Sequence, residues 1–156
     1  MSLQMVLADL QSKAGTETHV SDWLAISQDR IQQFADATGD HQWIHVDVER
    51  ANAQSPFGGP IAHGFLTLSL IPYLTGSVDA DKPEYPGVRM GINYGLNKVR
   101  FPNPVRVGNR VRSRTTLLNA EEVQGQGIQI VRQVMIEVEG EPKPGCVAET
   151  VSRLYF

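Results

Sequence analysis

The sequence contains little cysteine and no excess of basic residues. Cys146 is the only cysteine in 156 residues, so no internal disulfide can form and the fold does not depend on an oxidising compartment. Lysine and arginine total 14 against 17 aspartates and glutamates, which gives a net charge of -3. Domains that bind nucleic acid usually have a basic surplus. We therefore expect a protein that does not bind nucleic acid.

Long apolar runs are missing as well. No segment approaches the roughly 20 apolar residues that a membrane-spanning helix needs. Residues 3–13 have their apolar side chains at helical spacing with polar residues between them, unlike the continuous apolar stretch of a signal peptide. These absences predict a cytoplasmic protein that does not enter a membrane. The chain length suits a single domain over residues 1–156.

The first half of the sequence is rich in helical patterns. Residues 61–74 are the most continuous apolar segment, and their pattern predicts a helix that is buried on most sides. Ser27 and Asp47 are well placed as N-caps, and Gly39 as a left-handed C-cap. The other elements expected here are helices over 3–13, 28–37 and 47–53, a strand over 20–26 and a loop over 75–86.

The second half alternates apolar and polar residues, which is typical of strands. Gly91 and Gly95 interrupt the first of these strands and suggest bulges. Short polar connections between consecutive strands favour an antiparallel meander. The expected strands cover residues 89–101, 110–118, 128–138 and 146–156. The whole pattern predicts an α+β fold in which a curved antiparallel sheet wraps around a central apolar helix.

Two neighbouring segments carry chemistry. Asp40 and His45 follow Gly39 on what we expect to be a short non-helical segment, and a carboxylate beside an imidazole is a ready acid–base pair. Residues 57–64 are rich in glycine and lead into the apolar helix. Free N–H groups at such a helix start can bind a developing negative charge. The combination indicates an enzyme that acts on an activated carbonyl compound.

These two segments resemble the MaoC-like family of (R)-specific enoyl-CoA hydratases, which have the hot-dog fold. The family pattern Gly-Asp-x-Asn-Pro-aliphatic-His appears as residues 39–45, followed by Ala51 at a small position, and aliphatic-x-His-Gly appears as residues 61–64. Residues 101–108 match more loosely. The departures are Gln42 for Asn, Trp43 for Pro, and Pro72 where some members have serine.

The resemblance implies a reaction and a set of site residues. Asp40 and His45 would add water to a trans-2-enoyl-CoA to give the (R)-3-hydroxyacyl-CoA, and the Gly64 N–H would bind the thioester oxygen. The expected substrate-binding residues are Gly59, Ile61, Ala62, His63 and Phe65. Neither metal nor redox cofactor is implied, because coenzyme A enters only as part of the substrate. The resemblance also implies a homodimer with two sheets joined edge to edge and sites near the interface.

Plainer interpretations exist for each residue. Asp40 alone would suit a turn, and His45 alone a surface position; their spacing and the glycine segment together favour a catalytic pair. His41 falls on a variable position of the pattern and is treated as non-functional, and His63 suits a structural role that positions the loop. A metal site built on the crowded Asp40, His41 and His45 lacks a further Cys or His cluster. Three scattered basic residues could meet coenzyme A phosphates or simply face solvent: Lys98, Arg100 and Arg106.

Two other functions remain open from the sequence. The first is a hot-dog thioesterase, although such an enzyme does not need an imidazole paired with the carboxylate. The second is a non-catalytic module that binds acyl-CoA or acyl-carrier protein and resembles nodulation protein N. The sequence leaves open the acyl length, the choice between coenzyme A and carrier protein, and the division of acid and base roles.

Overall fold

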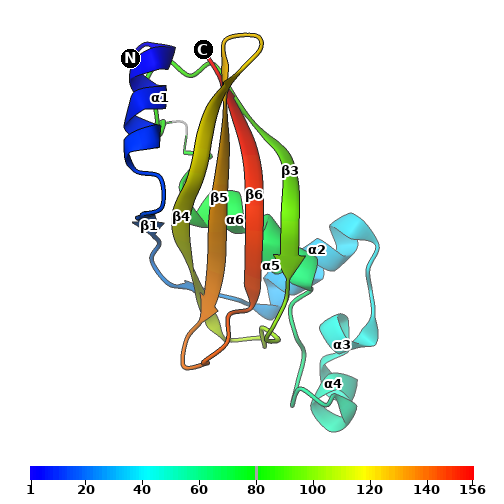
Figure 1. Ribbon diagram of the computed structural model, residues 1–156. Coiled ribbons are helices and arrows are strands. Elements are labelled where there is room, and N and C mark those ends of the chain that lie inside the picture. The colour runs from blue at the N-terminus through cyan, green and yellow to red at the C-terminus, as the bar shows by residue number, and fades with distance from the viewer. Residues whose placement is uncertain (80) are drawn as a thin grey trace.

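A single antiparallel sheet forms the body of the protein. The computed structural model describes residues 1–79 and 81–156, so residue 80, in the loop expected over 75–86, lies outside the description. The strand order is β1-β4-β5-β6-β3, with the short β2 also paired to β4, and every pair is antiparallel (Figure 1). The strands are β1 Glu17–Val20, β2 Leu24–Ala25, β3 Met90–Arg100, β4 Arg110–Val123, β5 Gly127–Val138 and β6 Cys146–Tyr155.

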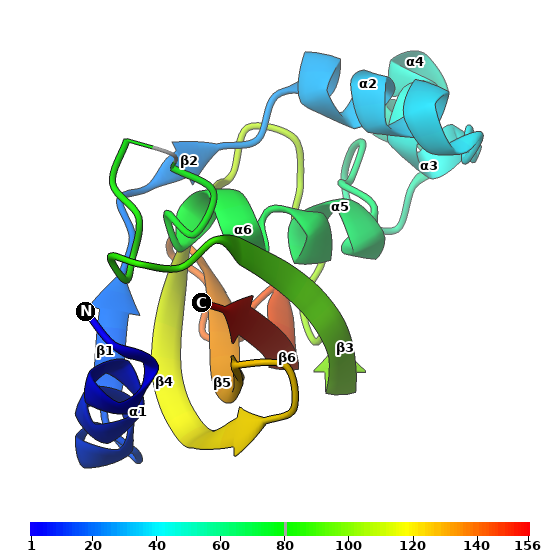
Figure 2. The ribbon, with the colours of Figure 1, turned by 90° about the horizontal axis from the view of Figure 1, so that it is seen from above.

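The helices divide into three groups. Figure 2 shows the sheet curving around α5 and α6, with α2, α3 and α4 gathered beyond α5 and α1 near the opposite edge of the sheet. In the described residues, no helix has the length and apolar character needed to cross a membrane. The helices are α1 Leu3–Ser12, α2 Gln28–Thr38, α3 Trp43–Val46, α4 Val48–Gln54, α5 Gly64–Ser69 and α6 Ile71–Leu74. The arrangement confirms the predicted α+β fold with a curved sheet around apolar helices.

The single helix expected over residues 61–74 is wrong in its extent. It begins only at Gly64 and is divided at Leu70 into α5 and α6. Pro72 explains the division, because it lacks a backbone N–H and its ring crowds the preceding turn of an uninterrupted helix. Ile61 instead forms an isolated antiparallel bridge with Arg106. The break leaves α5 as a short helix whose first residue is Gly64.

Two further expectations need correction. The strand over residues 20–26 is two short strands, because Ser21 interrupts it and uses its Oγ to accept a 2.9 Å hydrogen bond from the Ser113 N–H. The segment that holds His45 is not irregular but forms the single turn α3. The three caps are confirmed: the side chains of Ser27 and Asp47 accept from Arg30 N–H and Arg50 N–H, and Gly39 has a φ of 80°.

Two apolar clusters hold the helices on the sheet. The larger lies between α5–α6 and the concave face of β4, β5 and β6, and includes the fully buried Ile136 and Cys146. Burial raises the pKa of the Cys146 thiol to about 11, which fits a packed structural thiol and not a nucleophile. The smaller cluster packs α1 on β4 and β5 through Val6, Leu10 and Ile130. The larger cluster fixes α5, and therefore Gly64, relative to the sheet.

Candidate active site

Asp40 lies directly after the left-handed end of α2. The Gly39 N–H donates to Ala35 O at 2.8 Å and closes the helix, and the positive φ of Gly39 turns the chain away from the helix axis. Beyond this turn the Asp40 Oδ1 accepts a 3.3 Å hydrogen bond from the Gln42 N–H. Asp40 is exposed. Its carboxylate is therefore accessible to a substrate.

His45 is buried in α3 with one ring nitrogen committed to the main chain. Its Nδ1–H donates to Ile61 O at 2.7 Å, and the Ile61 N–H donates back to Ile44 O at 3.0 Å. Gln28, in α2, donates from Nε2 to His45 O at 2.8 Å. Because Nδ1 carries the proton, Nε2 of the neutral ring has a free lone pair. These bonds hold His45 in an orientation in which Nε2 is the available nitrogen.

Burial lowers the pKa of His45. The Ile61 hydrogen bond acts in the opposite direction, and the neighbouring His63 ring adds to the lowering. Burial disfavours the imidazolium because a charged ring loses hydration that the site does not replace. The neutral ring, with its lone pair on Nε2, is therefore the form expected at neutral pH.

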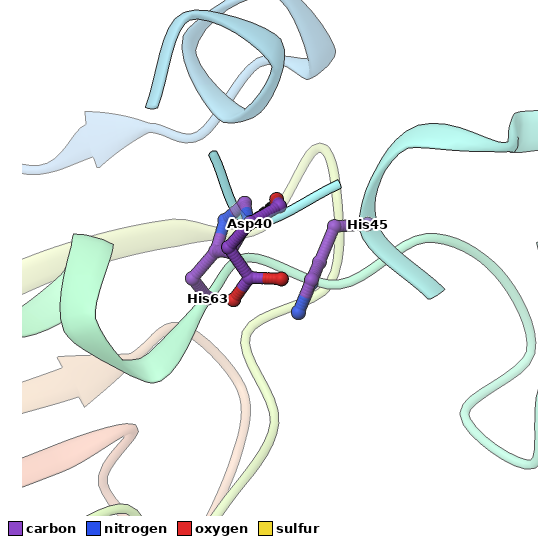
Figure 3. A group of neighbouring side chains, drawn as sticks. All are labelled: Asp40, His45 and His63. Atoms are coloured by element: carbon purple, nitrogen blue, oxygen red, sulfur yellow. Dashed lines mark hydrogen bonds between the residues drawn. The ribbon is translucent and has the colours of Figure 1, made fainter. Parts of the chain in front are cut away.

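The side chains of Asp40, His45 and His63 lie close together (Figure 3). A carboxylate oxygen of Asp40 and one ring nitrogen from each histidine all lie within 4.8 Å of one another. The His63 ring stacks on the His45 ring, with centroids 3.8 Å apart and an interplanar angle of 24°. The structure thus brings together the two residues that the sequence predicted as a pair, with His63, one of the expected substrate-binding residues, beside them.

The three side chains are poorly arranged for a metal. Structural or catalytic zinc needs ligand atoms that converge on one point at about 2.0–2.2 Å. Imidazole lone pairs lie in the ring plane, and two nearly parallel stacked rings direct theirs along separate planes. His45 Nδ1 and His63 Nε2 are also occupied by main-chain carbonyls. A site without metal remains our prediction.

Gly64 begins α5, and its N–H is free of backbone partners within the described part of the chain. The first backbone bonds of this helix run from the Leu66 and Thr67 N–H groups to His63 O. The space beside the Gly64 Cα is filled by Phe101, since a Cβ built there would lie 2.9 Å from Phe101 Cδ2. Phe101 also meets Phe65 edge-on at 6.1 Å. A side chain at this position would therefore displace the Phe101 ring.

The remaining predicted site residues differ in their surroundings. Gly59, Ile61 and Ala62 are buried, and Ala62 belongs to the larger apolar cluster. Its N–H donates to Val105 O at 2.7 Å, which ties this segment to the 105–107 stretch. Phe65 is 67% exposed on α5. The expected substrate-binding residues therefore include one exposed aromatic ring and three buried residues, and their contact with substrate stays a prediction.

The other charged candidates lie outside this group. His41 is exposed and pairs with Asp36 at 2.8 Å, which raises the pKa of His41 and lowers that of Asp36. Arg106 is exposed beside Gly58, where a built Cβ would come within 3.5 Å of its Nη1. Trp43, at the family's proline position, packs under the Arg50 guanidinium at 4.2 Å.

Sequence reasoning missed two supporting residues. Gln28 anchors the main chain of His45, and Phe101 covers Gly64. The match of residues 101–108 to the family pattern was the one signal that pointed toward Phe101. Nothing local distinguishes Gln28 from an ordinary polar residue in the first turn of a helix.

Comparisons with known proteins bear on the family and the fold. The MaoC like domain matches residues 9–139. Over 147 residues the chain is 52% identical to 3-hydroxyacyl-thioester dehydratase Z of Mycobacterium tuberculosis, covering 94% of each chain. It is 42% identical over 153 residues to nodulation protein N of Rhizobium leguminosarum bv. viciae, covering 98% of this chain and 93% of the relative. The MaoC-like dehydratase from Rhodospirillum rubrum superposes with a TM-score of 0.70 at 23% identity, over 91% and 92% of the two chains.

Proposed function

The chain belongs to the MaoC-like domain family, and from this premise we propose that it reversibly hydrates a trans-2-enoyl-CoA to the (R)-3-hydroxyacyl-CoA. The relationship itself supports the coarser statement that the protein is a hydro-lyase, a 3-hydroxyacyl-thioester dehydratase. The (R) configuration, coenzyme A as the carrier and the roles of individual residues belong to the proposal. The observation that carries it is the placement of the Asp40 carboxylate within 4.8 Å of a His45 ring nitrogen, in a ring whose Nδ1–H is committed to Ile61 O.

The reaction needs what this pair offers. Water is a poor nucleophile, and the alkene is activated only through conjugation with its thioester. When the water oxygen bonds to C3, a proton must leave the water and another must reach C2. Asp40 is the better candidate for removing the first proton, and His45 Nε2 orients the water and shuttles a proton. Because the pair takes up one proton and returns one, it ends the reaction in its starting state.

The second requirement is stabilisation of the thioester oxygen. As water adds, electron density moves to this oxygen and an enolate-like charge develops. A backbone N–H that is already oriented lowers the energy of that charge without reorganisation. We assign this role to Gly64, whose N–H has no backbone acceptor among the described residues. Phe101 and Phe65 form the apolar wall beside it.

A homodimer is part of the proposal. β3 is an 11-residue strand at the end of the sheet, and its outer edge has no neighbour in the described chain. Apolar side chains along it are exposed, among them Tyr94 at 56% and Leu96 at 47%. Long exposed apolar edges promote uncontrolled pairing and are normally covered. A second copy paired along β3 would cover this edge and extend the wall near Phe65.

Incubation with crotonyl-CoA tests the function and separates its rivals. We expect the enoyl absorbance to fall without release of free thiol. Chiral analysis should then identify the (R)-3-hydroxy product. Release of thiol without hydration would support a thioesterase. If the protein binds the thioester but neither hydrates nor hydrolyses it, the result would support the non-catalytic binding module that resembles nodulation protein N. Repeating the assay over several chain lengths and on acyl-carrier protein would define the substrate.

A further inference from the structure

His63 contacts both members of the proposed catalytic pair. It is 2% exposed and lies at the last position before α5. Its Nε2–H donates to the main-chain carbonyl of Asp40 at 3.0 Å, and one ring face stacks on His45. Phe34 packs against the same ring with centroids 4.9 Å apart. Gln42 is bonded to both through its main chain only, since its N–H donates to Asp40 Oδ1 and its carbonyl accepts from the His45 N–H. Among the described residues, His63 is the one whose side chain is recorded in contact with both.

The contact with Asp40 restrains a short loop. Asp40 follows the left-handed Gly39, and its other recorded hydrogen bond joins its own side chain to the Gln42 N–H two residues away. That bond shapes the loop but does not fix it to the rest of the molecule. The His63 bond does so, because it ties Asp40 to a residue held by α5. His63 therefore sets the position of the Asp40 main chain relative to the helix start.

The contact with His45 restrains a ring plane. The Nδ1–H bond to Ile61 O fixes one atom of the His45 ring and leaves rotation about that bond open. The stacked His63 ring limits this rotation from one face. Phe34, in turn, supports the His63 ring. The direction of His45 Nε2 therefore depends on the ring of His63 as well as on Ile61.

We propose that His63 is a positioning residue, which sets the separation and mutual orientation of Asp40 and His45 through its Nε2–H and its ring face. This inference rests on the proposed function, since it describes how the pair is held for hydration. The bond to Asp40 O requires the proton on Nε2 of His63. Its Nδ1 is buried and has no hydrogen-bond partner among the described residues. Two parts of one side chain thus act on two different residues.

Two substitutions separate these parts. His63→Phe keeps a ring face but loses the N–H, and His63→Gln keeps an N–H donor at similar reach but loses the ring. Displacement of reacting groups by about 1 Å costs about 100-fold in rate. We expect each variant to lower kcat by about 10- to 100-fold, with KM within about threefold of wild type, because the proposal has His63 act through Asp40 and His45. His19→Phe, on exposed β1, is the matched control and should keep wild-type kinetics.

Each kinetic outcome has a definite meaning. If His63 only fills space, His63→Phe retains full kcat, and that result would overturn the proposal. Wild-type kcat in His63→Gln would equally overturn it, because the ring face would be dispensable. In an Asp40→Asn background, His63→Phe should lower kcat by less than about threefold. The His63 N–H acts by positioning the Asp40 carboxylate, and this carboxylate is already absent from that background. A full additional loss would mean that His63 acts independently of Asp40 and would contradict the proposal.

Imidazole NMR of the unmodified protein gives a readout that does not depend on activity or on folding of a variant. We expect the Nδ1–H tautomer for His45, the Nε2–H tautomer for His63, and ring-current shifts from their stacking. An Nδ1–H tautomer for His63, or unstacked rings, would overturn the proposal. If the NMR result is as expected but wild-type protein leaves enoyl thioesters unchanged, the hydratase assignment fails and the geometric claim stands.

Discussion

Substitution of Gly64 separates two reasons for a glycine at the start of α5. Any residue can adopt the backbone conformation at Gly64, so a side chain there is limited only by the space available. A Cβ would lie 2.9 Å from Phe101 Cδ2 and 3.0 Å from its Cγ and Cε2. Reaching ordinary contact requires the ring to withdraw by about 0.5 Å. Overpacking costs about 1–3 kcal/mol, and because Phe101 is 40% exposed and can move, we expect the lower limit for Gly64→Ala.

The stability effect of Gly64→Ala is therefore small. A loss of about 1 kcal/mol corresponds to a fall in Tm of about 2–4 °C for a domain of this size. The activity effect should be larger, because the methyl group and the displaced ring crowd the N–H that binds the thioester oxygen. Loss of one oxyanion donor costs about 100- to 1,000-fold. Partial obstruction should lower kcat/KM by about 10-fold or more, through both a raised KM and a lowered kcat.

A double variant distinguishes crowding from loss of the binding N–H. Gly64→Ala combined with Phe101→Ala removes the clash, so thermal denaturation should show the Tm of the Phe101→Ala protein alone. Steady-state kinetics should still show the lowered kcat/KM relative to Phe101→Ala, because the methyl group remains at the thioester site. Full recovery of both Tm and kcat/KM would mean that glycine only accommodates Phe101. The oxyanion role would then belong to another group.

Three further results are expected. The value of kcat/KM should stay constant from pH 7 to below pH 6.5, the ordinary pKa of histidine. It should fall only when His45 takes up a proton at its lowered pKa. A fall in kcat/KM that begins above pH 6.5 would contradict the neutral, buried ring. Sedimentation should show a dimer at micromolar concentration. Leu96→Lys, which puts a charge among the exposed apolar side chains of β3, should give monomers, and a dimer unaffected by this change would place the interface elsewhere. Ile136→Ala should cost about 2–5 kcal/mol of unfolding free energy in denaturant titration, because it leaves a cavity beneath the helices, and a loss below about 1 kcal/mol would contradict tight packing there.

Local chemistry explains which elements were predictable. Ser27, Gly39 and Asp47 act on their own helices through short-range hydrogen bonds or backbone conformation, so the sequence pattern predicted all three caps. Buried positions recur at a period close to two in β4, β5 and β6 because one face of the sheet packs on the helices, whereas β3 is exposed at nearly every position. The acid and the imidazole were also recognisable, since they follow a cap that the sequence specifies.

Nonlocal contacts explain the errors. Apolar character continues through residues 61–74 because α5 and α6 each bury one face, and this continuity concealed the break that Pro72 imposes. The interruption at Ser21 depends on a bond to Ser113 in a distant strand. The stacking of His63 on His45 and the approach of Phe101 to Gly64 likewise join residues far apart in sequence. No window of the sequence contains both partners of these contacts, so they become visible only in the fold.

The most direct measurement compares Asp40→Asn and His45→Gln with wild type in the hydration of crotonyl-CoA. Both changes keep the side-chain size, so circular dichroism should report an unchanged fold. General acid–base groups contribute about 100- to 10,000-fold, and we expect kcat to fall by at least about 100-fold in each variant. Turnover near the wild-type value in either well-folded variant would contradict the claim that Asp40 and His45 together carry the reaction.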